Sequence, residues 1–96
     1  MDQWIVYILQ SAKDERYYIG STSDLERRLK KHNAGGVDAT KYRRPLNMVY
    51  AEPCKNKKEA MAREKYLKSL KSHVVIAALI EQSQTAGSTT IPSKTD

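Results

Sequence analysis

The 96-residue chain has one cysteine, no phenylalanine and no long apolar run. A single thiol, Cys54, excludes an intramolecular disulfide and a zinc site built from several cysteines, and it fits a reducing, cytoplasmic location. No stretch approaches the roughly 18 apolar residues of a membrane-spanning helix. The first apolar segment, Trp4 to Leu9, follows the acidic Asp2, which is atypical of a signal peptide. We therefore expect no membrane association.

Acidic residues are scarce in the middle of the chain. The segment from Leu25 to Lys71 holds 14 of the 17 Lys/Arg but only 5 of the 11 Asp/Glu, so it carries +9, while the rest carries −3. A basic surface attracts polyanions because it neutralises phosphates and releases counterions. Nucleic acid is the first partner to consider and an anionic membrane the second, with a surface kept basic for solubility as the alternative.

A chain of this length builds one small core, so we expect a single domain over residues 1–82. Residues 83–96 are polar and without periodicity, which predicts a disordered tail.

The first half of the chain predicts a hairpin and a helix. The apolar run at 4–9 is typical of a strand covered on both faces, and residues 17–20 predict a second strand that Gly20 ends. Ser23 and Glu26 have the spacing of a capping box, so a helix should begin at about residue 24.

The second half predicts a strand followed by helices. Residues 46–52 form a strand that Pro53 stops, and Asn56 caps a helix reaching about Leu70. The apolar segment from His73 predicts a third helix, although Val74 to Ala77 would also suit a strand.

Three polar side chains lie on helix faces that should be buried. Arg28 and His32 lie on or beside the stripe formed by Leu25 and Leu29. Glu64 follows Ala60 by four residues and precedes Leu67 by three, so it lies on the apolar face of its own helix. A buried charge needs a cation, a metal or a wet cleft, and a structural ion pair of Glu64 with Arg28 is the simpler alternative.

Two tyrosines share the neighbourhood of these groups. Tyr7 and Tyr18 each lie within an apolar run of adjacent predicted strands, so both can face one cleft. Core packing is the usual role of a strand tyrosine and remains the alternative for each.

These residues together resemble a known family. The chain contains "VYI" at 6–8, "YIG" at 18–20, an arginine eight residues after Gly20, a histidine four residues further on and a glutamate on a later helix. This order resembles the GIY-YIG nuclease domain, over about Trp4 to Ile80. The segments "ATKYRRPLNMVY" and "EAMAREKYLKSLK" are similar to the small stand-alone YhbQ-like group, which is related to the nuclease domain of UvrC and to those of branched-DNA endonucleases.

The resemblance implies an α/β (α+β) fold, in which a three-stranded mixed sheet is flanked by helices. It also implies a divalent-metal-dependent endonuclease, acting in DNA repair or recombination, with Mg²⁺ or Mn²⁺ as cofactor. Carried over by position, the functional residues are the motif tyrosines Tyr7 and Tyr18, the motif glycine Gly20, the catalytic Arg28, the accessory His32 and the metal ligand Glu64.

Each implied role has a chemical reason. A single carboxylate at Glu64 would hold a hard cation that keeps several waters. The planar guanidinium of Arg28 suits the oxygens of the scissile phosphate. Tyr7 would orient or deprotonate the attacking water, helped by positive charge on His32 or the metal, while Tyr18 would position substrate or water.

The chain departs from the family pattern at three places. Ile5 replaces the first motif glycine, Ser21 stands where the UvrC branch has a lysine, and no asparagine follows Glu64. A nucleic-acid-binding module that keeps the nuclease fold without catalysis is therefore the rival interpretation.

The basic segment predicts the nucleic-acid surface. Its candidate residues are Arg27, Lys30, Lys31, Lys41, Tyr42, Arg43 and Arg44, and Lys55, Lys57 and Lys58 continue the same surface. Such residues hold the nucleic-acid backbone without recognising bases, and Tyr42 can stack on a base. We expect DNA as the partner of a monomer whose specificity comes from DNA structure or from a partner protein. Dimerisation through the apolar segment "HVVIAALI" is the alternative.

Overall fold

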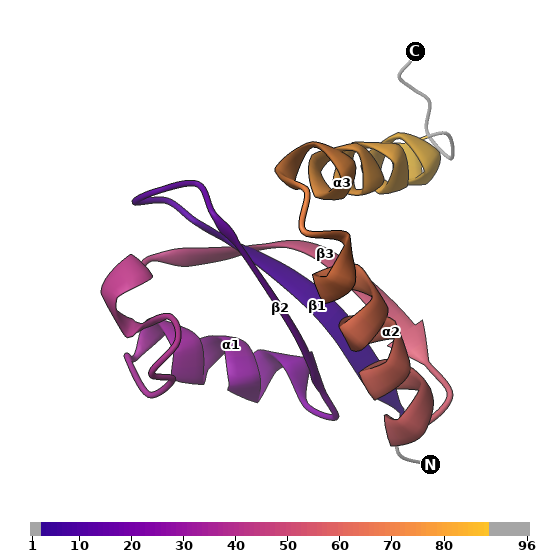
Figure 1. The fold of residues 1–96 in the computed structure, drawn as a ribbon. Helices are drawn as coiled ribbons and strands as arrows, with labels where there is room; N and C mark the ends of the chain where they lie inside the picture. The colour runs from indigo at the N-terminus through magenta and orange to yellow at the C-terminus, as the bar shows by residue number, and fades with distance from the viewer. Residues whose placement is uncertain (1–2, 89–96) are drawn as a thin grey trace.

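The computed structural model of the chain describes residues 3–88, with side chains described through residue 83. In chain order the elements are β1 (Trp4–Ser11), β2 (Tyr17–Thr22), α1 (Leu25–Asn33), the short 3₁₀ helix η1 (Lys41–Arg43), β3 (Leu46–Cys54), α2 (Lys57–Leu70) and α3 (His73–Ser88). The expected hairpin and the order of strands and helices are confirmed, so the α+β class holds (Figure 1).

The sheet is antiparallel throughout, so the mixed sheet that we expected is wrong. Its order is β2-β1-β3, and β1 pairs antiparallel with both neighbours. Strands β2 and β3 consequently run in the same direction, as expected of two strands joined through a helix. They form no parallel ladder because β1 lies between them.

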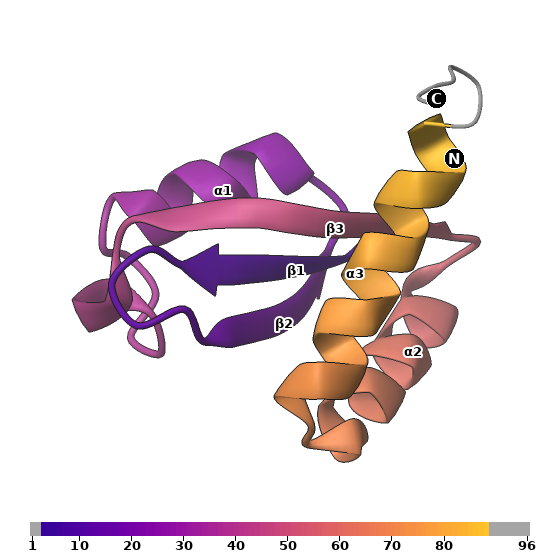
Figure 2. The same cartoon turned by 90° about the horizontal axis from the view of Figure 1, so that it is seen from above.

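The central strand β1 separates two apolar clusters. Val6 and Ile8 pack with Leu67 of α2 and with residues of α3, whereas Tyr7 and Leu9 face the opposite way and pack near α1. Figure 2 shows α1 and α2 on opposite sides of the strands. The alternation of side chains along a strand produces this division, and it explains why β1 is an almost unbroken apolar run.

Several predicted boundaries shift. The side chain of Asp24, not Ser23, caps α1 and accepts a hydrogen bond from the Arg27 amide at 3.1 Å, whereas Asn56 caps α2 as expected. Strand β3 continues through Pro53 because it is an edge strand, where a missing amide donor costs no ladder bond.

Two elements run further than expected. Strand β2 continues past Gly20 to Thr22. Helix α3 extends to Ser88, so the prediction of a disordered tail is wrong for residues 83–88, and the remaining positions, 89–96, lie outside the described residues. Between residues 3 and 88, no helix has the length and apolar character needed to cross a membrane.

Candidate active site

Four of the predicted site residues meet on the α1 face of the sheet: Tyr7, Tyr18, Arg28 and His32. The rings of Tyr7 from β1 and Tyr18 from β2 are 6.4 Å apart between centroids. The imidazole of His32, from the last turn of α1, lies edge-on to both, at 5.9 Å from Tyr7 and 4.9 Å from Tyr18. We expected the two tyrosines to face one cleft; their rings do lie on the same face of the sheet, but Tyr7 is buried in the core.

Gly20 is required because the phenol of Tyr7 lies over it. The two residues are cross-strand partners in the β1–β2 ladder. A Cβ atom on residue 20 would lie 2.5 Å from the Tyr7 hydroxyl oxygen and 3.2 Å from a ring carbon of Tyr18. Any larger side chain would therefore push the motif tyrosines out of position.

A chain of hydrogen bonds runs from Arg28 into the core. Arg28 Nε donates to the Tyr7 hydroxyl at 3.4 Å, and this hydroxyl lies 3.1 Å from His32 Nε2. On the other side of the imidazole, Nδ1 lies 2.8 Å from Thr40 Oγ1, which donates to the Val37 carbonyl at 3.5 Å.

One assignment of protons satisfies every link of this chain. A guanidinium only donates, so the Tyr7 oxygen accepts from Arg28 and its own proton points to His32 Nε2. The imidazole then carries its proton on Nδ1 and donates it to Thr40, whose hydroxyl proton is directed to the Val37 carbonyl. In this arrangement His32 is neutral.

The titration behaviour of these groups agrees with that arrangement. Burial, aided by the charges of Arg28 and Lys31, lowers the pKa of His32 to about 4. The prediction that His32 supplies positive charge to Tyr7 is therefore wrong for the protein without substrate; the neighbouring cation is Arg28. Burial raises the pKa of Tyr7, and the hydrogen bond from Arg28 opposes this rise. The same hydrogen bond raises the pKa of Arg28.

Glu64 reaches the site from α2, on the other side of β2. Its Oε1 accepts a hydrogen bond of 2.6 Å from the Ser21 hydroxyl, and its Oε2 lies 2.7 Å from Lys68 Nζ. The side chain is 20% exposed. The alternative of an ion pair between Glu64 and Arg28 is wrong, because the cation that pairs with this carboxylate is Lys68. The charge of Glu64 adds to the rise in the Tyr7 pKa.

The donor set around Glu64 fits a hard divalent cation held by one protein ligand. Within the described part of the chain, no group of three or more His, Cys, Asp or Glu side chains gathers at a common point. The partly exposed Glu64 carboxylate, steadied by Ser21, provides oxygen atoms and leaves room for water, which Mg²⁺ and Mn²⁺ retain. Its ion pair with Lys68 competes with a metal ion for the same oxygen.

The predicted nucleic-acid surface is only partly open. Arg27 and Lys31 are exposed on α1, and Lys30 forms a wide pair with Glu26 at 4.0 Å. The ring of Tyr42 is 76% exposed, with the Lys41 ammonium 5.1 Å from its centroid.

The two arginines that follow Tyr42 are engaged within the protein. Arg43 lies 3.5 Å from the Asp14 carboxylate and buries its Nε and Nη2, so it holds the β1–β2 turn instead of lying free for substrate. Arg44 donates to the Lys41 carbonyl, and its guanidinium lies over Gly35.

Sequence reasoning missed three residues that hold the site together. Lys68 follows Glu64 by four residues, a spacing at which oppositely charged side chains meet on a helix, so this pair was detectable. Ser21 and Thr40 carry no such signal, because their partners Glu64 and His32 come from other elements. Only the fold brings these hydroxyls to the carboxylate and the imidazole.

The chain is similar in sequence to a known protein family and to several bacterial proteins. Residues 3–74 match the family model described as the GIY-YIG catalytic domain. The chain is 50% identical over 66 residues to the UPF0213 protein CPE1444 of Clostridium perfringens, covering 68% of this chain and 70% of that protein. It is 43% identical over 65 residues to the UPF0213 protein YazA of Bacillus subtilis, covering 67% and 66%.

A solved structure is also similar. The solution NMR structure of the UPF0213 protein BH0048 from Bacillus halodurans matches with a TM-score of 0.56 at 33% identity, and the match covers 98% of this chain and 99% of that one.

Proposed function

This chain belongs to the GIY-YIG catalytic domain family, and from that premise we propose that it is an endonuclease that hydrolyses phosphodiester bonds of nucleic acid, most readily DNA, with a divalent cation. The observation that carries the proposal is the contact of Arg28, Tyr7 and His32 in one hydrogen-bonded chain, with the Glu64 carboxylate held against β2 by Ser21. The proposal includes a cytoplasmic location and a role in repair or recombination, for which the reduced Cys54 and the family resemblance are the support.

Arg28 binds and stabilises the phosphate in this proposal. Its Nε is engaged with Tyr7, which leaves the remaining donors of the guanidinium for phosphoryl oxygens. Because the side chain is only partly buried, these donors can reach a substrate while the hydrogen bond to Tyr7 fixes their direction. Developing negative charge on the phosphate is then stabilised by donors that are already in place.

Tyr7 and His32 handle the proton of the attacking water. The Tyr7 oxygen takes a proton from water as its own proton passes to His32 Nε2, and the resulting hydroxide attacks phosphorus. His32 becomes positively charged in this step, and the nearby charge of Arg28 makes that protonation unfavourable when no substrate is bound. A bound phosphate offsets the charge of Arg28 and so makes proton uptake by His32 easier. The leaving oxygen takes its proton from solvent.

Glu64 would hold the Mg²⁺ or Mn²⁺, and Tyr18 would position the substrate. When bound, the cation supplies Lewis-acid stabilisation of the phosphoryl oxygens and of the leaving group. Ser21 orients the carboxylate by its hydrogen bond to Oε1. Tyr18, in edge contact with His32, lines the surface over which the phosphate approaches.

A cleavage assay with matched variants tests the proposal. Wild-type protein and the variants Glu64→Gln, Arg28→Lys and Tyr7→Phe are incubated with labelled single-stranded, duplex and branched DNA and with RNA, in Mg²⁺, Mn²⁺ or EDTA. We expect cleavage in metal only, with a loss of about 100-fold or more in each variant. Glu59→Gln, which alters an exposed carboxylate on the same helix, should keep full activity.

The same assay separates the rival interpretation. Binding without cleavage, by a folded wild-type protein in both metals and on every substrate, would leave a nucleic-acid-binding module that has lost the chemistry. Such a module should bind equally well with Gln at position 64.

A further inference from the structure

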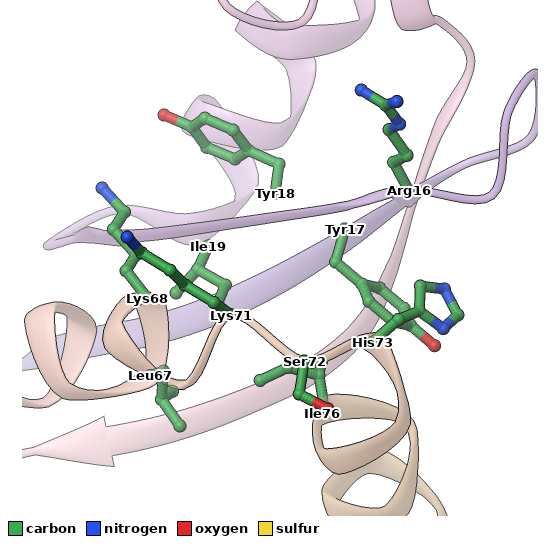
Figure 3. Close-up of a pocket in the computed structure, with 10 residues that line it drawn as sticks. All are labelled: Arg16, Tyr17, Tyr18, Ile19, Leu67, Lys68, Lys71, Ser72, His73 and Ile76. Atoms are coloured by element: carbon green, nitrogen blue, oxygen red, sulfur yellow. The ribbon is translucent and has the colours of Figure 1, made fainter.

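A groove of about 600 Å³ lies along the free edge of β2, next to the candidate active site and distinct from the basic surface on α1. Figure 3 shows its walls: β2 on one side, and the end of α2 with the start of α3 on the other. Small-ligand sites commonly occupy about 300–1,000 Å³, so the groove has room for a group of that size. The mechanism proposed above uses only Tyr18 among its lining residues.

The groove is basic. Arg16, Lys68 and Lys71 line it, and none of its ten lining residues is acidic. Lys68 is paired with Glu64, whereas Arg16 and Lys71 form no ion pair with any carboxylate in the described part of the chain. Two unpaired cations beside an open groove attract an anion, and both have donors suited to phosphate.

One end of the groove is aromatic. The rings of Tyr17 and His73 stack with centroids 4.5 Å apart and an angle of 25° between their planes. Next to them, Ile19, Leu67 and Ile76 add apolar wall. Figure 3 shows Tyr17 and Ile19 on one side of β2 and Tyr18 and Arg16 on the other. The apolar wall and the cation Arg16 therefore border the same strand edge from its two sides. A planar heterocycle attached to a phosphate matches both features.

Two residues connect the groove to the catalytic cluster. Tyr18 lines the groove, and its ring lies in edge contact with His32. Lys68 also lines the groove while its ammonium lies 2.7 Å from Glu64 Oε2. A ligand in the groove therefore lies beside the groups that would hold the scissile phosphate.

We propose that this groove is a subsite that binds one nucleotide of the nucleic-acid substrate, adjacent to the scissile phosphate. The phosphates on either side of that nucleotide contact Arg16 and Lys71, and its base lies against Tyr17 and His73. The inference rests on the proposed function for the identity of the ligand as a nucleic acid. It adds a contact surface from β2, α2 and α3 to the basic residues of α1.

The test is a binding measurement that requires no catalysis. Fluorescence anisotropy of a labelled oligonucleotide is recorded in EDTA, over a range of salt concentrations, for wild-type protein and for the double variant Arg16→Gln/Lys71→Gln. The matched control is Lys13→Gln/Lys65→Gln, which removes the same charge from exposed positions outside the groove. Thermal unfolding verifies that each variant is folded.

We expect the groove variant to weaken binding on the order of tenfold and to lower the salt slope by about 1.4–1.8, the loss of two phosphate contacts. The control should weaken binding by less than about twofold. Tyr17→Leu, which keeps apolar packing, should weaken binding by about five- to 100-fold if a base stacks there. Equal losses in the groove and control variants, or no loss in Tyr17→Leu, would overturn the subsite.

A competition arm distinguishes a nucleotide of the polymer from a free nucleotide. A mononucleotide at millimolar concentration should displace the oligonucleotide poorly, and displacement at micromolar concentration would make the groove a small-molecule site and overturn the proposal. Because every binding measurement is made in EDTA, its result does not depend on whether the protein cleaves nucleic acid. Unchanged binding in the groove variant, together with cleavage of DNA by the wild-type protein, would overturn the subsite and leave the proposed function intact.

Discussion

At the scale of single residues, the position of Tyr7 depends on the absence of a side chain at Gly20. Gly20→Ala would place a methyl group 2.5 Å from the Tyr7 oxygen, inside the buried cluster on the α1 face. We expect the free energy of unfolding to fall by about 1–3 kcal/mol, the usual cost of overpacking. The cleavage rate should fall by a larger fraction than the free energy of unfolding. Urea unfolding and the cleavage assay measure both.

Gly36→Ala is the control for this substitution. A Cβ at residue 36 would meet the flexible side chain of Lys31 at 3.0 Å, which can move away at little cost. A destabilisation equal to that of Gly20→Ala would contradict the importance that we assign to the Tyr7 contact.

His32 links stability to pH. Its pKa is about 4 in the folded protein and about 6.5 in an unfolded chain, so between these values the unfolded state takes up a proton and the folded state does not. The free energy of unfolding should therefore fall as pH decreases from about 6.5 to about 4, by roughly 3 kcal/mol from this group. Urea unfolding at pH 7, 5.5 and 4 measures the slope.

Two variants isolate this contribution. His32→Gln should flatten the pH dependence between about 6.5 and 4, and His73→Gln, which alters an exposed imidazole, is the control for loss of a histidine. An identical slope in wild type and His32→Gln would show that His32 is not the group held neutral by burial.

At the scale of elements, one salt bridge on α2 controls access to the proposed metal ligand. The Lys68 ammonium occupies the side of Glu64 that faces away from Ser21. Lys68→Gln removes this competitor, so we expect Mn²⁺ to bind about two- to fivefold more tightly in the absence of nucleic acid, as for the loss of a partly exposed ion pair. Electron paramagnetic resonance of free Mn²⁺ measures the affinity.

Lys65→Gln is the matched control, because Lys65 is exposed on the same helix and forms no ion pair in the described part of the chain. Equal affinities in all three proteins would mean that Lys68 does not compete for the carboxylate. The stability of Lys68→Gln should stay within about 0.5 kcal/mol of wild type.

Helices and strands were predictable where a local signal decides them. The unbroken apolar run of β1 and the cap at Asn56 are local features, and both predictions are confirmed. The cap of α1 shifted from Ser23 to Asp24 because two adjacent residues can both cap, and the direction of the entering chain selects one. The pairing of β1 with β3 depends on the path of the chain after α1. The hydrophobic periodicity of the sequence gives no information about that path.

The candidate site was predictable to a similar degree. The motif spacing indicated Tyr7, Tyr18, Arg28 and His32, and the structure places them together. Charge alone overestimated the open surface, since Arg43 is engaged with Asp14. The groove at the β2 edge was not foreseeable, because Arg16 and Lys71 are far apart in the sequence and line one groove only when α2 and α3 pack beside β2.

At the scale of the whole molecule, the two basic surfaces involve helices that pack on opposite faces of the sheet. Arg27 and Lys31 extend from α1, whereas Arg16 and Lys71 border the groove between β2 and the α2–α3 junction. Helix α1 packs on one face of the sheet, and α2 and α3 pack on the other. We expect a nucleic acid that contacts both surfaces to cross the candidate site, past Tyr18 and Arg28.

This arrangement predicts how the two surfaces combine in binding. Arg27→Gln/Lys31→Gln and Arg16→Gln/Lys71→Gln should each weaken binding of a long oligonucleotide, and their effects on the binding free energy should add in the fourfold variant, because the two sets contact different phosphates. With an oligonucleotide too short to span the site, the two double variants should cease to be additive. Additivity that is independent of length would mean that the two surfaces bind separate molecules, and the path of one strand across Tyr18 and Arg28 would be wrong.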